Sequence, residues 1–325
     1  MNKALPYIIT FLAGLGGTLV LTPVARQLAI KFKAIDKPCS RKVHSEPTPR
    51  WGGIAIALSV LLAVFMSLVF FEDVRLHMHS RTQLNLMGLT LGGGLMLVLG
   101  MLDDRYDVPA KLKLAGQIVI AIIMIKFGIV ISFLNIPFMG FTYLPAWISW
   151  PLTIFWIVGI TNAINLLDGL DGLLAGVSVI ISILFFIIAL MTGQFTVALL
   201  MMALTGASLG FLRYNFNPAS IFMGDSGSLF LGLMYASLSI IGALKVSTTV
   251  AILIPVFIMG LPIFDTSFAI IRRFTNGRPI FSADKEHVHH QLLARGYSVK
   301  QAVIYMYVIC GTLGAIGVSL ALFIH

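Results

Sequence analysis

Long apolar runs separated by short polar segments make up most of the chain. The runs are about 20 residues long, which is the length an α-helix needs to cross the hydrocarbon core of a bilayer, roughly 30 Å thick. The pattern therefore predicts an all-α polytopic membrane protein with about ten transmembrane helices. We expect these helices at residues 4–24, 51–71, 83–102, 113–134, 148–167, 172–191, 195–212, 227–244, 248–270 and 302–323. No linker is long enough to divide the chain, so a single membrane domain over 1–325 is expected.

The polar segments fall into two sets when the connections are assigned alternately to the two sides of the membrane. One side receives the segments at 25–50, 103–112, 168–171, 213–226 and 271–301. These segments carry most of the 22 Lys and Arg residues, and basic residues collect in cytoplasmic loops, so this side is predicted to be cytoplasmic. Among the 13 acidic residues, Glu72 and Asp73 are the ones expected on the other side. The polar chemistry is therefore expected at the cytoplasmic face.

The composition agrees with a membrane protein and excludes other classes. With 58% hydrophobic and 11% charged residues, the chain has more apolar surface than one soluble core could bury. The net charge of +9 is explained by basic loops beside anionic headgroups, so nucleic acid is not an expected partner. The two cysteines, Cys39 and Cys310, indicate no disulfide framework. The first apolar run lacks a small-residue cleavage site and is interpreted as an anchor.

An acidic cluster stands at the cytoplasmic end of the third predicted helix. It contains Asp103, Asp104 and Asp107, and Lys111 and Lys113 follow it. Adjacent carboxylates beside lipid are costly unless cations, protons or a metal compensate their charge. The cluster is either a solvated loop neutralised by its own basic residues, or a place where a metal and a diphosphate gather and an Asp accepts a proton.

A second polar set ends the fifth predicted helix. Asn162, Asn165, Asp168 and Asp171 are spaced by three residues, which places them along one helical stripe. A capped helix end would explain one Asn and one Asp, but four such groups in line require partners. We therefore favour a binding site over a helix cap.

A third set precedes the eighth predicted helix and contains Asn215, Phe222 and Asp225. Asp225 is expected to open that helix, where it could act only as an N-cap or could bind a divalent ion that bridges phosphate oxygens. Phe222 could stack on a nucleobase or pack at the membrane interface. The residues leave both alternatives open.

Three histidines, His287, His289 and His290, lie in the longest cytoplasmic segment. A zinc site is disfavoured because neither a Cys partner nor a second cluster stands at ligand spacing. Binding of a diphosphate suits the histidines better, and an exposed run without a role is the alternative. Asp265 is expected in a helix-end ion pair with the arginines two turns later, without a part in catalysis.

A basic stretch precedes the second predicted helix. Arg41, Lys42, His44 and Arg50 could hold acidic headgroups, or could bind the phosphate of a lipid substrate.

Five segments together resemble the polyprenyl-phosphate N-acetylhexosamine-1-phosphate transferases. They are RKVHSEPTPRWGG (41–53), LDDRYDVPAKLKLAGQ (102–117), NAINLLDGLDGL (162–173), NPASIFMGDSGSL (217–229) and HVHHQL (287–292). The resemblance spans nearly the whole chain. It is closer to the bacterial enzymes that transfer N-acetylglucosamine-1-phosphate in teichoic acid, O-antigen or related glycan synthesis than to the enzyme that transfers phospho-MurNAc-pentapeptide.

The resemblance implies a reaction that depends on Mg²⁺ or Mn²⁺, in which undecaprenyl phosphate attacks the β-phosphate of UDP-N-acetylglucosamine and releases UMP at the bacterial plasma membrane. It implies that Asp225 binds the metal, with Asp104 as a second ligand, and that Asp103 or Asp104 deprotonates the lipid phosphate. The remaining residues are assigned to the nucleotide and sugar: Lys113, Asn162, Asn165, Asp168, Asp171, Asn215, Phe222, His287, His289 and His290. The choice between direct attack and a covalent aspartyl intermediate stays open, with direct attack favoured.

Two other functions compete with this interpretation. A transporter would place its charges near the middle of the bilayer, whereas the acids here are expected at helix ends. A membrane phosphatase acting on the same lipid is the nearer rival, and it would need no UDP-sugar. Membrane lipids are expected partners of the apolar helices. The sequence leaves open whether the protein forms a homodimer.

Overall fold

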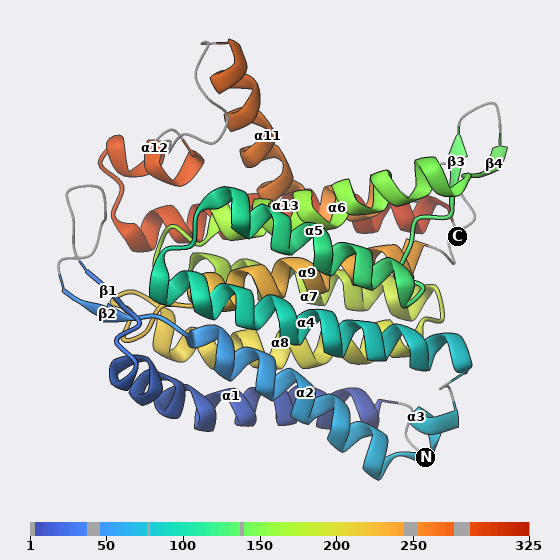
Figure 1. Ribbon diagram of the computed structural model, residues 1–325, viewed down its shortest axis with the longest axis horizontal. Coiled ribbons are helices and arrows are strands. Elements are labelled where there is room, and N and C mark those ends of the chain that lie inside the picture. The colour runs from blue at the N-terminus through green and yellow to red at the C-terminus, as the bar shows by residue number, and fades with distance from the viewer. Residues whose placement is uncertain are drawn as a thin grey trace.

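The computed structural model describes residues 4–37, 46–76, 79–136, 140–243, 253–275 and 287–324. Long helices lie side by side in one bundle, and α11 projects from it (Figure 1). The helices are α1 (Leu5–Lys31), α2 (Gly52–Phe70), α3 (Glu72–Leu76), α4 (Ser80–Tyr106), α5 (Ala110–Lys126), α6 (Ala146–Leu167), α7 (Leu173–Met191), α8 (Phe195–Asn215), α9 (Gly224–Ala243), α10 (Leu253–Ile258), α11 (Gly260–Thr275), α12 (Val288–Ala294) and α13 (Val299–Ile324).

Two short antiparallel hairpins accompany the helices. Strands β1 (Ile35–Asp36) and β2 (Thr48–Pro49) pair at the end of the bundle near α12, and β3 (Phe133–Ile136) pairs with β4 (Gly140–Tyr143) at the opposite end (Figure 1). The helix α3 lies at the same end as the second hairpin. The two ends of the bundle therefore differ in the elements that they carry.

Seven helices of the described residues are long and apolar enough to cross a membrane. They are α1, α2, α4, α6, α7, α8 and α13. The prediction of a mostly helical, polytopic membrane protein is therefore confirmed, and the count of ten spans stays a prediction. The interval 248–270, expected to be one helix, lies partly outside the described residues, and its described part is divided at Met259 between α10 and α11.

The predicted helix at 113–134 is the one whose end differs most from the structure. Helix α5 ends at Lys126, and a turn at Phe127 and Gly128 follows it. The chain then enters the hairpin of β3 and β4. Hydropathy predicted a longer helix because the residues of this turn and strand are as apolar as those of the helix itself.

The centre of the bundle is formed by α7, α8 and α9, whose side chains are largely buried. Tyr235 of α9 is fully buried, and its hydroxyl donates a hydrogen bond to the backbone oxygen of Ser178 and shares another with Ser182 Oγ, both on α7. In a bilayer a buried hydroxyl without a partner is costly. These bonds therefore help to hold α9, which begins at the polar end of the bundle, against α7.

Candidate active site

The polar segments predicted from the sequence meet in one cavity of about 360 Å³. The cavity lies where α4 and α6 end and α9 begins, at the end of the bundle that carries the first hairpin and α12 (Figure 1). Eight of the predicted site residues line it: Arg50, Asp104, Asp168, Asp171, Asn215, Phe222, Asp225 and His290. Segments that are far apart in the sequence therefore build one site.

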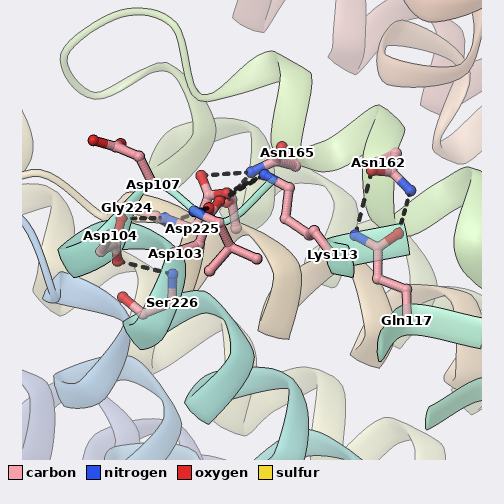
Figure 2. Close-up of polar contacts among 12 residues, drawn as sticks. Asp103, Asp104, Asp107, Lys113, Gln117, Asn162, Asn165, Gly224, Asp225 and Ser226 are labelled. Carbon is pink, nitrogen blue, oxygen red and sulfur yellow. Dashed lines mark hydrogen bonds and ion pairs between the residues drawn. The ribbon is translucent and has the colours of Figure 1, made fainter. Parts of the chain in front are cut away.

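Asp225, in the first turn of α9, is the centre of the polar contacts (Figure 2). Lys113 Nζ of α5 lies 2.6 Å from its Oδ2, and Asn165 Nδ2 of α6 lies 3.0 Å from its Oδ1. Lys113 also contacts Asp103 Oδ2 at 2.7 Å, and Asn165 donates to Ser228 Oγ at 2.8 Å. One ammonium group therefore bridges two carboxylates, and Asp225 is held from two neighbouring helices.

Asp104 caps the start of α9. Its two carboxylate oxygens accept hydrogen bonds from the backbone N–H groups of Asp225 (2.9 Å) and Ser226 (3.0 Å). Gly224, at φ 72°, makes this approach feasible, because a Cβ there would lie 2.5 Å from Asp104 Oδ2. The side chain of Asp225 is thereby free of the capping role that the sequence had left open, and it faces Lys113 and Asn165.

Asp103 faces a different direction from Asp104. Its Oδ1 accepts the backbone N–H of Val108 at 2.8 Å, and its Oδ2 pairs with Lys113. It does not line the cavity. Of the two adjacent acids, Asp104 is thus the one placed to meet a ligand.

The start of α2 is attached to the loop that carries Phe222. The backbone N–H of Phe222 donates to Pro49 O at 2.8 Å, and its carbonyl accepts the N–H of Gly52 at 3.0 Å. Gly53 is needed here because a Cβ would collide with the backbone of Gly227. The backbone of Phe222 is therefore held through both its N–H and its C=O group, and Phe222 lines the cavity.

Arg50 reaches the cavity from the same segment. Its Nη2 lies 2.6 Å from Asp36 Oδ1 on β1, and its Nη1 lies 4.0 Å from Asp107 Oδ1. The other three residues predicted to bind the lipid phosphate, Arg41, Lys42 and His44, lie outside the described residues.

Asp171 and Asn215 join the turn after α6 to the loop after α8. Asp171 Oδ2 accepts hydrogen bonds from Asn217 Nδ2 and the backbone N–H of Ala219, both at 3.0 Å. Asn215 Oδ1 accepts the backbone N–H of Gly172 at 3.1 Å, and its Nδ2 donates to Ile221 O at 3.0 Å. These two residues line the cavity and also hold its two walls together.

Asp168 stands at the end of α6, beside the other acids. Burial of its carboxyl group, together with the negative charges of Asp225 and Asp104, raises the pKa of Asp168 to about 8. The cavity therefore has an excess of negative charge, which favours cations and protons.

The three histidines have three different environments. His287 Nδ1 lies 2.9 Å from Asp265 Oδ2, so Asp265 pairs with His287 and not with the arginines as the sequence suggested. His289 is 1% exposed and lies under the turn after α6, where a Cβ on Gly169 would come within 2.5 Å of its Nε2. Burial, aided by the charge of His290, lowers the pKa of His289 to about 4. Of the three, His290 lines the cavity.

Comparison with known proteins identifies the family. The model of glycosyl transferase family 4 matches residues 86–243. A Bacillus subtilis protein named as a probable undecaprenyl-phosphate N-acetylglucosaminyl 1-phosphate transferase is 43% identical over 308 residues, which cover 95% of this chain and 83% of that protein. The chain belongs to glycosyl transferase family 4, the polyprenyl-phosphate N-acetylhexosamine-1-phosphate transferases.

Two further family members show where the chain stands within it. A decaprenyl-phosphate N-acetylglucosaminephosphotransferase of Mycolicibacterium smegmatis is 37% identical, over 94% of this chain and 80% of that protein. A phospho-N-acetylmuramoyl-pentapeptide-transferase of Bacillus cytotoxicus is 33% identical, over 95% of both chains. The chain is thus more similar to these N-acetylglucosamine enzymes than to that peptidoglycan enzyme.

Asn162, which the sequence predicted to contact the nucleotide, has a different partner in the structure. Asn162 does not line the cavity; its side chain pairs with Gln117 of α5, which the sequence interpretation did not single out (Figure 2). The available signal was the spacing of Gln117 from Lys113, which places both on one face of α5. Asp265 was also missed as the partner of His287, because 22 residues separate the two in sequence.

The site offers oxygen donors suited to the divalent ion that the family resemblance implies. Carboxylates of Asp104 and Asp225 both line the cavity. Mg²⁺ is typically held by one or two carboxylates, with waters and substrate phosphates as its other ligands. In the described residues no group of three or more His, Cys, Asp or Glu side chains is arranged to hold a metal. A site that relies on two acids and on the substrate's phosphates fits this donor set.

Proposed function

We propose that this protein transfers N-acetylglucosamine-1-phosphate from UDP-N-acetylglucosamine to undecaprenyl phosphate or a similar polyprenyl phosphate, with release of UMP. The observation that supports the proposal is the cavity in which Asp104, Asp168 and Asp225 meet at one end of a membrane-spanning bundle. The names of the similar N-acetylglucosamine enzymes supply the acceptor and the transferred group, and UDP as the carrier follows from the resemblance of the sequence motifs. The reaction would begin a cell-envelope glycan on the cytoplasmic side of the bacterial plasma membrane.

The nucleotide would occupy the part of the cavity lined by Phe222. The backbone of Phe222 is held by two hydrogen bonds, which fixes where its side chain begins, and its ring would stack on uracil. Asn215 and Asp171 hold the walls on either side of this part of the cavity. His290 would contact the sugar or the diphosphate from α12, and Arg50 would meet the lipid phosphate.

In the reaction, an oxygen of the lipid phosphate attacks the β-phosphorus of the UDP-sugar, and the bond between that phosphorus and the oxygen of UMP breaks. Catalysis of phosphoryl transfer is mostly positioning and charge stabilisation. Lys113 and Asn165 orient Asp225, and Asp104, which keeps unused lone pairs beside the two N–H groups it accepts, is the better-placed acid to take a proton. Bound Mg²⁺, or Mn²⁺, held by Asp225 and Asp104, would neutralise charge on the two phosphates.

The test is turnover by the purified protein. Labelled UDP-N-acetylglucosamine and UDP-MurNAc-pentapeptide are each offered with undecaprenyl phosphate, with and without Mg²⁺, and both UMP and lipid-linked sugar are measured. We expect metal-dependent turnover of the first donor. Turnover of the second donor alone would assign the protein to the peptidoglycan branch, and release of phosphate from the lipid without a UDP-sugar would indicate a phosphatase.

A further inference from the structure

A pair of amide side chains joins α5 to α6 one helical turn away from the acidic centre. Asn162 Nδ2 donates to Gln117 Oε1 at 2.7 Å, and Gln117 Nε2 donates back to Asn162 Oδ1 at 3.3 Å (Figure 2). Asn162 Nδ2 also donates to the backbone oxygen of Val158, and Gln117 is 1% exposed. Asn162 is partly buried, so the two amides satisfy each other at a helix contact that is largely closed on the side of Gln117.

The amide pair lies on the same helix faces as two residues that hold Asp225. Lys113 precedes Gln117 by four residues on α5, and Asn165 follows Asn162 by three residues on α6. Residues three or four apart on a helix point in the same direction. Lys113 and Asn165 reach different oxygens of Asp225, Oδ2 and Oδ1. The relative position of α5 and α6 thus decides whether both contacts form at once.

We propose that Gln117 and Asn162 are positioning residues whose reciprocal hydrogen bonds set α5 against α6 so that Lys113 and Asn165 hold Asp225 from two sides. The proposal assigns Asn162 to this contact and not to the nucleotide. It rests on the proposed function only for its kinetic readout, because the contact itself is a property of the fold.

The membrane environment makes such a pair selective for one register. Sliding α5 by one residue moves its side chains by about 1.5 Å along the axis and turns them by about 100°, since the helix has 3.6 residues per turn. Gln117 and the side-chain oxygen of Asn162 would then lose their partners, while Asn162 Nδ2 would keep its bond to Val158 on the same helix, and unsatisfied polar groups are costly beside apolar side chains. The aligned register is therefore favoured before any substrate binds.

The test replaces the pair one residue at a time and together. Gln117→Leu and Asn162→Leu are each expected to lower kcat by about tenfold, because small misplacements of catalytic groups reduce rates strongly, while KM for the UDP-sugar changes less than about twofold. The double variant should be no worse than either single variant, since one contact is lost in all three. The exchanged pair, Gln117→Asn with Asn162→Gln, should recover most of the rate.

Ser239→Ala serves as the matched control. Ser239 lies on α9, where its Oγ accepts a hydrogen bond from Trp156 Nε1 of α6 at 3.0 Å. The variant therefore removes another hydrogen bond of α6, away from the acidic centre. Its kcat should stay within about twofold of the parent protein, because Asp225 keeps both partners. Equal losses in this control and in Gln117→Leu would overturn the proposal, because they would indicate a general packing effect.

Two further outcomes separate the proposal from its alternatives. A raised KM for Asn162→Leu with unchanged kinetics for Gln117→Leu would show that Asn162 contacts the nucleotide, and would overturn the proposal. If the parent protein turns over no UDP-sugar, the proposed function fails, but the thermal midpoints of the two single variants and the double variant still test the pair. A double variant that loses no more than one single variant supports the contact, and additive losses refute it.

Discussion

Asp103 and Asp104 are adjacent in the sequence, yet the structure gives them different partners. Asp103 faces Lys113 and Val108, whereas Asp104 caps α9 and lines the cavity. The sequence left open whether Asp225 caps α9. In the structure Asp104 caps that helix, and the carboxylate of Asp225 faces Lys113 and Asn165. At the scale of single residues, position in a motif therefore does not determine role.

Removal of the charge on Asp225 tests its central place. Asp225→Asn keeps the size of the side chain but leaves Lys113 with Asp103 as its remaining carboxylate partner and removes a proposed metal ligand. We expect turnover to fall by about 10²- to 10³-fold, as for other losses of transition-state charge stabilisation. The rate of UMP release by purified protein measures this. Asp107→Asn, whose side chain is 96% exposed, is the control and should stay close to the parent rate; a variant at 225 with normal activity would contradict the assignment.

The burial of His289 predicts how stability depends on pH. Its pKa is lowered to about 4 in the folded protein from an ordinary value of 6.5, so between these values the unfolded chain binds the extra proton. Stability should therefore fall as the pH is lowered from about 6.5 to about 4, by at most about 1.4 kcal/mol per pH unit from this residue. Thermal midpoints in detergent across this window should decline less in His289→Gln than in the parent protein. Parallel declines would show that His289 does not titrate as its burial implies.

At the scale of elements, the short helix α12 is attached to α11 through one acid. Asp265 accepts the backbone N–H of Val288 at 3.0 Å and pairs with His287 at 2.9 Å, so it holds the first residues of α12. Asp265 is itself outside the cavity, whereas His290, three residues after His287, lines it. The orientation of His290 thus depends on a residue that does not line this cavity.

This dependence predicts a particular kinetic pattern. Asp265→Asn should lower kcat/KM by about tenfold, because α12 loses its attachment and His290 its orientation. The double variant with His290→Ala should be no worse than His290→Ala alone, since both changes remove the same contribution. Steady-state kinetics with UDP-N-acetylglucosamine measure the pattern. Thr275→Val, at the exposed end of the same helix, is the control; additive losses would argue against the attachment.

The elements also show how far the sequence could predict the fold. Seven membrane helices and the place of Asp225 in the first turn of α9 follow from apolar run length and motif position. The end of α5 at Lys126 and the division between α10 and α11 at Met259 could not be predicted, because apolar residues continue through both. The convergence of eight site residues was predictable from loop alternation, whereas pairs such as Gln117 with Asn162, 45 residues apart, depend on helix packing that hydropathy does not encode.

At the scale of the whole molecule, the elements that line the cavity and the helix α3 lie at opposite ends of the bundle (Figure 1). The positive-inside rule predicts that the cavity end faces the cytoplasm. Arg75 of α3 and Lys111 of α5 are both exposed and report on the two ends. In a variant without Cys39 and Cys310, Arg75→Cys should react with a membrane-impermeant maleimide in intact cells, and Lys111→Cys only after the cells are opened. The UDP-sugar donor is charged and would have to reach the cavity from the cytoplasm, so the orientation bears directly on the proposed reaction. If Lys111→Cys reacted in intact cells and Arg75→Cys only in opened cells, the acidic centre would face the outside. The cytoplasmic UDP-sugar could then not reach the cavity, which would contradict the proposed reaction.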